Sequence, residues 1–193
     1  MKSRLRKTTL VGVTALMLCV APGVEASAQR TMRGENLITV EGSYPFTGPY
    51  GWGADLTYGQ YLLSSYWKAG ASVSTYSATF TDGQPLPYLH ACAHGGWMYR
   101  LVGTRNRVFN LYGGAGAFLG YEAVDPKGLV PEEYKGEDFS SGRFLYGVQV
   151  SLEMEIFFSR RVALILGARA PMNFSSPYGW FHYQVVGGLR LNI

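Results

Sequence analysis

The stretch FLYGVQVSLEMEI, residues 144–156, alternates between two kinds of side chain. Apolar residues stand at every second position from Phe144 onward, and the residues between them include Gln149, Glu153 and Glu155. A period of two places the two sets on opposite faces of a β-strand, whereas a helix needs a period near 3.6. The stretch therefore predicts a strand with one apolar face and one polar face.

Seven other stretches repeat this alternation along the chain. They are NLITVEGSYPF (36–46), WGADLTYGQYL (52–62), WKAGASVSTY (67–76), YLHACAHGGWMYRL (88–101), FNLYGGAGAFLGYE (109–122), VALILGARA (162–170) and FHYQVVGGLRLNI (181–193). Membrane-crossing strands need about 9–11 residues, and an even number of them can close into a barrel without free edges. The pattern predicts an all-β fold, an eight-stranded antiparallel up-and-down transmembrane β-barrel. The alternative is an exported soluble β-barrel or sandwich.

The connections between these strands support the membrane interpretation. In chain order they are TGPYG (47–51), LSS (63–65), TDGQPLP (81–87), GTRN (103–106), residues 123–142, FSRR (158–161) and PMNFSSPYG (171–179). Long and short connections alternate, as in outer-membrane barrels with short periplasmic turns and longer external loops.

The N-terminus has the three parts of a secretory signal peptide. A basic segment with Lys2 and Arg4 precedes an apolar run that is too short to span a bilayer, and Ala26-Ser27-Ala28 matches an A-x-A cleavage site. We expect residues 1–28 to be a cleaved signal peptide and residues 29–193 to be a single β-barrel domain. This predicts a location in the outer membrane of a Gram-negative bacterium.

Removal of residues 1–28 changes the charge of the chain. The full sequence carries 17 basic and 13 acidic residues, and residues 29–193 carry 13 and 12, a net charge of +1. Such a balance gives no case for direct nucleic-acid binding. One cysteine, Cys92, remains, so the exported chain has no internal disulfide.

The polar faces predict a set of side chains inside the barrel. An eight-stranded barrel is just wide enough for side chains to fill, and charges buried there must pair. The set consists of Glu41, Asp55, Lys68, His90, His94, Arg100, Glu122, Glu153, Glu155, Arg169, His182 and Arg190. We expect a plugged polar lumen rather than a channel. Across the tight FSRR turn, Arg169 is expected to pair with Glu153 or Glu155.

Two features of this set resemble functional sites. His90, Cys92 and His94 could suggest a metal site, but side chains on one face of a strand repeat only every 6.6–7 Å or so, which is too far apart for three to share one zinc ion. Glu153 and Glu155 resemble a carboxylate pair for acid–base catalysis, although a salt-bridge network is the favoured use. The sequence therefore predicts no metal site, no cofactor and no catalytic residues.

Several segments resemble the TraO family of conjugative transposon proteins. They are GGWMYRL (95–101), GAFLGYEAV (116–124), YGVQVSLEMEIFFSRRVALILGARAPM (146–172) and GWFHYQVVGGLRLNI (179–193). The resemblance implies a structural, non-catalytic component of a conjugative DNA-transfer apparatus, similar to a type IV secretion system, in the outer membrane. It implies other envelope proteins of that apparatus and outer-membrane lipid as partners, and it brings no catalytic residues.

Two other functions remain open from the sequence. The first is a barrel enzyme acting on envelope lipids, for which His182 with Ser175 or Ser176 are the candidate residues. The second is a small adhesin or receptor that binds through the acidic loop. That loop carries Asp125, Glu132, Glu133, Glu137 and Asp138 against Lys127 and Lys135.

Overall fold

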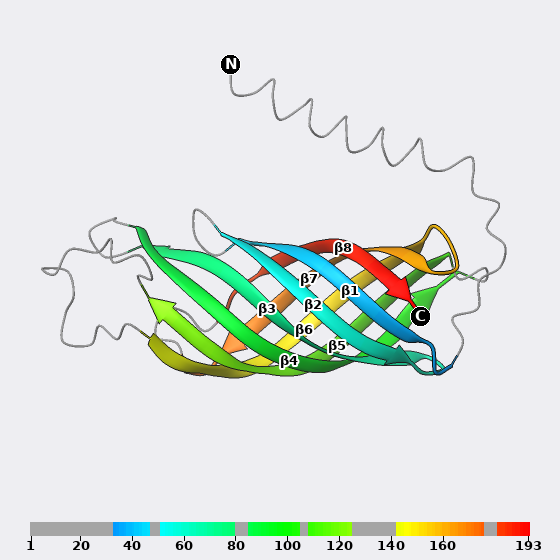
Figure 1. The fold of residues 1–193 in the computed structure, drawn as a ribbon, viewed down its shortest axis with the longest axis horizontal. Coiled ribbons are helices and arrows are strands. Elements are labelled where there is room, and N and C mark those ends of the chain that lie inside the picture. The colour runs from blue at the N-terminus through cyan, green and yellow to red at the C-terminus, as the bar shows by residue number, and fades with distance from the viewer. Residues whose placement is uncertain (1–32, 47–50, 80–84, 105–107, 125–141, 176–180) are drawn as a thin grey trace, which may run out of the picture.

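The chain folds into a closed β-barrel. The computed structural model describes residues 33–46, 51–79, 85–104, 108–124, 142–175 and 181–193. Within these ranges the strands are β1 (Asn36–Pro45), β2 (Trp52–Tyr61), β3 (Ser65–Thr79), β4 (Pro85–Gly103), β5 (Phe109–Val124), β6 (Gly142–Phe157), β7 (Val162–Asn173) and β8 (Gln184–Asn192). Each pairs antiparallel with the next, and β8 pairs with β1 (Figure 1). The predicted eight-stranded up-and-down barrel is confirmed.

The two faces of each strand have opposite chemistry. In β6, Val150 and Leu152 lie exposed on the outside, while Gln149, Ser151 and Glu153 between them are buried inside. The other strands alternate between the two sides in the same way, although β7 also buries Ala163 and Ile165. The barrel is therefore apolar outside, and it buries its charged side chains inside, the reverse of a water-soluble protein.

One wall of the barrel is longer than the other. Strands β3 to β6 have 15, 19, 16 and 16 residues, while β1, β2, β7 and β8 have 10, 10, 12 and 9. Five of the seven predicted connections are wrong at their ends because strands extend into them. The largest overlaps arise where β4 begins at Pro85 and where β7 continues to Asn173. Pro171 fits in β7 because the regular β7–β8 ladder stops at Arg169. Beyond it the Pro171 carbonyl accepts from the His182 N–H at 3.1 Å, and among the described residues no ladder hydrogen bond requires an N–H at Pro171.

The short turns and the C-terminus lie at the same end of the barrel. The β2–β3 turn (62–64) and the β6–β7 turn (158–161) both lie there, and β8 ends beside the start of β1 (Figure 1). The N–H of Asn36 donates to the Ile193 carbonyl at 3.0 Å, and the N–H of Ile193 donates to the Asn36 carbonyl at 2.9 Å. We call this the turn end and the opposite end the loop end.

Glycines make room for large side chains in the lumen. A Cβ atom on Gly147 would lie 2.6 Å from the Phe118 ring, and one on Gly188 would lie 2.9 Å from Cγ of Glu41. Real Cβ atoms do not approach so closely, so the larger side chains occupy the space that these glycines leave.

The predicted signal peptide, residues 1–28, lies outside the described residues, so its cleavage stays a prediction. Among the described residues no helix is long and apolar enough to cross a membrane.

Candidate functional site

The structure places the predicted lumen residues on the inward faces of the strands. Those that it buries are Glu41, Asp55, Lys68, His90, His94, Glu122, Glu153, Glu155, Arg169, His182 and Arg190. Arg100, near the turn end of β4, is half-buried. The strand alternation thus brings charged side chains from every strand into one enclosed space.

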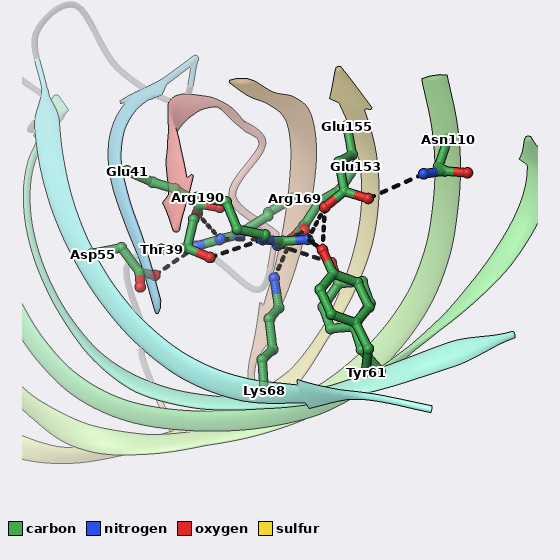
Figure 2. Close-up of polar contacts among 11 residues, drawn as sticks. Thr39, Glu41, Asp55, Tyr61, Lys68, Asn110, Glu153, Glu155, Arg169 and Arg190 are labelled. Carbon is green, nitrogen blue, oxygen red and sulfur yellow. Dashed lines mark hydrogen bonds and ion pairs between the residues drawn. The ribbon is translucent and has the colours of Figure 1, made fainter. Parts of the chain in front are cut away.

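An ionic layer spans the lumen, and Glu153 of β6 lies at its centre (Figure 2). The layer consists of Glu41, Asp55, Lys68, Glu153, Glu155, Arg169 and Arg190. The Glu153 carboxylate accepts hydrogen bonds from Lys68, from the Tyr66 hydroxyl and from Arg190 at 3.1 Å. It is completely buried, so its charge depends on these donors.

Glu155 follows two positions later on the same face. It accepts from the Tyr61 hydroxyl, from Arg190 at 3.0 Å and from the side-chain amide of Asn110 at 3.2 Å. Four strands thereby meet at one carboxylate: β2, β5, β6 and β8.

Arg190 of β8 joins the two carboxylates. Its Nη1 and Nη2 atoms donate to Glu155 and Glu153, and its Nε donates to the Thr39 hydroxyl at 2.9 Å. The guanidinium also lies over the Tyr66 ring, 4.6 Å from the ring centroid. Its planar set of donors suits this role, because it reaches several acceptors at once.

Arg169 of β7 forms the second half of the ionic layer. It donates to Asp55 at 2.6 Å and to Glu41, from β2 and β1, and it lies 3.7 Å from Glu153. The predicted pairing with Glu153 is therefore present but is the longest of the three. Its nearest partners come from β1 and β2, two and three strands away around the closed sheet. A count of residues from the β6–β7 turn could not find them, because they depend on how the sheet closes.

An apolar layer fills the lumen nearer the turn end. Leu37, Tyr61, Tyr66, Met98 and Tyr112 form one buried cluster. Ring centroids of Tyr61 and Tyr66 are 5.5 Å apart, and those of Tyr66 and Tyr112 are 4.9 Å apart, both edge to face. The prediction of a purely polar lumen is therefore incomplete. The signal was available, because alternation places Tyr66, Met98 and Tyr112 on inward faces.

The part of the lumen nearest the loop end has a different composition. We call it the loop-end lumen, and it contains Tyr76, His90, Glu122, His182 and Gln184. His90 lies 2.8 Å from Glu122, and the rings of Tyr76 and His182 lie against each other, 5.1 Å apart at their centroids. Gln184 donates to the Tyr76 hydroxyl. This end therefore relies on histidine, tyrosine and amide groups where the ionic layer uses arginine and lysine.

A cavity of about 50 Å³ lies between the ionic layer and the loop-end lumen. Its lining includes Asp55, His94, Asn173 and the half-buried Cys92. His94 Nε2 is 3.0 Å from Asp55, while His94 Nδ1 and the amide nitrogen of Asn173 have no hydrogen-bond partner within the described part of the chain. The space suffices for a few water molecules.

The structure separates the residues that suggested a metal site. His90 is directed to Glu122 and His94 to Asp55. Within the described ranges, no three His, Cys, Asp or Glu side chains are placed to hold one metal ion.

Ser175 and His182, two candidate residues of the enzyme hypothesis, contact other parts of the barrel. The Ser175 hydroxyl accepts from the backbone N–H of Tyr146 at 3.2 Å, and His182 is buried beside Tyr76. Ser176 and the acidic loop of the adhesin hypothesis lie outside the described residues.

Fold and lumen together define the class: a small up-and-down β-barrel with an apolar exterior and a lumen filled by buried ion pairs. Solved structures of this shape include the N-terminal β-barrel domain of Pseudomonas aeruginosa OprF, with 11% identity and a TM-score of 0.51 over 83% of this chain and 98% of that chain. Neisserial surface protein A has 12% identity and a TM-score of 0.55 over 85% and 98% of the two chains. At these identities the likeness concerns the fold alone.

The family is given by the sequence. The family model described as conjugative transposon protein TraO matches residues 32–193, and the chain belongs to this family. The resemblance of the quoted segments to TraO proteins is thus confirmed. A search of curated proteins found no match.

Proposed function

We propose that this protein is a non-catalytic structural component of a conjugative DNA-transfer apparatus and lies in the outer membrane of a Gram-negative bacterium. The main support for this location is that apolar side chains lie on the outside of the barrel and charged side chains on the inside. Val40, Leu152 and Leu189 are 59%, 46% and 53% exposed on the outside, while Glu153 and Arg190 are fully buried inside. A continuous apolar exterior of this kind is unfavourable in water and suits a bilayer.

Aromatic side chains support the same location. Tyr44, Phe46, Trp52, Tyr121, Phe144 and Tyr183 are exposed toward the loop end, and Tyr58, Trp97, Tyr99 and Phe158 are exposed toward the turn end. Membrane barrels carry such girdles at both interfaces. In this arrangement the turn end faces the periplasm and the loop end faces the outside, after export through the predicted signal peptide.

The ionic and apolar layers support a structural role. The carboxylates of Glu153 and Glu155 are each held by three hydrogen-bond donors, and both are completely buried. Removal of a buried charge partner is strongly destabilising. The lumen therefore serves as the polar core that holds the barrel closed, and partners are expected among the other envelope proteins of the apparatus rather than DNA.

The test is deletion and complementation in a donor strain. Removing the gene should reduce transfer of the element strongly, and the full-length protein should restore it. The tagged protein, purified from outer membranes in mild detergent, should bring down other transfer proteins in amounts comparable with its own. Unchanged transfer after deletion, with no transfer protein co-purified, would refute the role.

A further inference from the structure

The turn end carries exposed apolar side chains on two adjacent segments. Leu63, at the tip of the β2–β3 turn, is 73% exposed. This turn lies beside β4, because the N–H of Arg100 donates to the Ser64 carbonyl at 2.8 Å. An irregularity in β4 between Arg100 and Val102 interrupts the alternation there.

This irregularity places two successive large side chains outside. Leu101 and Val102 are 57% and 56% exposed, although strict alternation would turn one of them into the lumen. Leu101 leans over β5, since a Cβ atom on Gly113 would lie 2.9 Å from its Cδ1. Bulges at the rims of barrels commonly redirect a side chain.

Leu63, Leu101 and Val102 lie closer to the turn-end rim than the outward aromatic side chains of β2, β3 and β4. Trp97 pairs in register with Trp67, and Leu101 and Val102 follow Trp97 and Tyr99 toward the turn. Aromatic girdles mark the level of the lipid headgroups. Apolar side chains past that level face headgroups and water, and exposed apolar groups in such a position mark protein contacts.

Basic side chains occupy the opposite side of the same rim, because the β6–β7 turn lies four strands from the β2–β3 turn around the closed barrel. The β6–β7 turn is held by the Ser159 hydroxyl, which accepts from the N–H groups of Arg161 at 3.3 Å and Val162 at 3.2 Å. Arg160 and Arg161 are exposed. Arg33, also exposed, precedes β1 at this end. We call Leu63, Leu101, Val102, Arg160 and Arg161 the turn rim.

We propose that the turn rim docks an acidic segment, with apolar side chains of its own, from another envelope protein of the transfer apparatus. This rests on the proposed function. Arginine forks bind carboxylates in a bidentate way, and apolar tips form the water-excluding part of an interface. Lipid headgroups would match the two arginines but not Leu63, Leu101 and Val102. A second copy would bring the same basic rim, and like charges oppose such a pairing.

The experiment uses the full-length protein in cells that carry the whole apparatus. The photoreactive residue p-benzoyl-phenylalanine replaces Leu63, and in a control protein it replaces Val150, which lies mid-barrel on the outside. The charge variants are Arg160→Glu with Arg161→Glu, and the matched control is Arg160→Lys with Arg161→Lys. The frequency of conjugative transfer is measured for these charge variants. It is also measured for the double variant Leu63→Ser, Val102→Ser, with Leu63→Met as the apolar control. Heat-modifiable migration on gels checks that each barrel is folded.

The expected result is an adduct from position 63 with an acidic segment of one transfer protein, and none from position 150. The glutamate variant should reduce that adduct at least fivefold and transfer at least tenfold. The lysine variant keeps the charge but not the bidentate fork, so it should lose clearly less of both. An adduct only with lipid or with a second copy would overturn the proposal, and so would unchanged transfer in the folded glutamate and serine variants. Failure of the proposed function is distinct, because deletion of the whole gene would then leave transfer unchanged.

Discussion

The ionic layer and the loop-end lumen use buried polar groups in different ways. In the ionic layer, Glu153 and Glu155 each meet three or more donors, and Arg190 serves both. In the loop-end lumen, Glu122 lies 2.8 Å from His90 and 3.9 Å from Arg143, and His90 lines a cavity. The comparison predicts that removal of a charged side chain costs most stability where several strands share one set of charges.

The largest effect is expected from Arg169→Ala in the ionic layer. The change leaves Glu41 without a hydrogen-bond donor among the described residues and Asp55 with His94 alone. Removing one partner of a buried pair costs about 3–5 kcal/mol. Urea unfolding in detergent, followed by tryptophan fluorescence, measures the change in the free energy of unfolding. Arg169→Lys, which keeps the charge, should lose clearly less, and equal losses in both variants would break the comparison.

A slightly smaller effect is expected when an arginine is placed on the outside. Leu152→Arg puts a charge in mid-strand on the lipid-facing side, where it costs about 2–4 kcal/mol in a membrane barrel. The cost should fall toward the interfaces, so Phe158→Arg should be tolerated better. Folding into lipid vesicles under urea measures both. Equal tolerance of arginine at the two positions would contradict a bilayer around this face.

A change in the loop-end lumen should cost less. His90→Ala removes the imidazole 2.8 Å from the buried Glu122 carboxylate, and loss of one partner of a buried polar group costs about 1–3 kcal/mol. Arg143 and water in the neighbouring cavity limit the loss. Ser72→Ala, at a cavity-lining hydroxyl, serves as the matched control and should change stability by less than about 0.5 kcal/mol. A loss for His90→Ala as large as that for Arg169→Ala would remove the distinction between the two regions.

No effect is expected from chelators. His90 and His94 are directed to separate carboxylates, so EDTA should leave the unfolding midpoint unchanged, and purified protein should contain far less than one zinc ion per chain. Elemental analysis decides this. Stoichiometric zinc that disappears in a His90→Ala, His94→Ala double variant would show that the loop-end lumen is a metal centre.

Local alternation in the sequence predicts the strands and the side that each residue faces. Glu153 and Arg190 fall on inward faces by this pattern alone, and the structure buries both. Alternation cannot rank the partners of Arg169, because Glu41 and Asp55 reach it only through closure of the sheet. The predicted ends of β4 and β7 are wrong because Pro85 and Pro171 usually indicate loops.

The apolar layer in the lumen is not predicted from the sequence, for a different reason. The rule that buried charges must pair selects only the charged residues of the inward faces, whereas Tyr61, Tyr66 and Met98 also point inward and fill the lumen near the turn end. Two tyrosines connect the apolar and ionic layers. The rings of Tyr61 and Tyr66 pack in the apolar cluster, and their hydroxyls donate to Glu155 and Glu153.

Cell fractionation tests the central claim, an inverted barrel in the outer membrane, most directly. Cells expressing the full-length protein are separated into soluble, inner-membrane and outer-membrane fractions, and the membranes are washed with carbonate. The mature protein should stay in the outer-membrane pellet, require detergent for release and shift on gels when boiled, and mass spectrometry should place its first residue at Gln29. Recovery in the soluble periplasmic fraction would contradict the account.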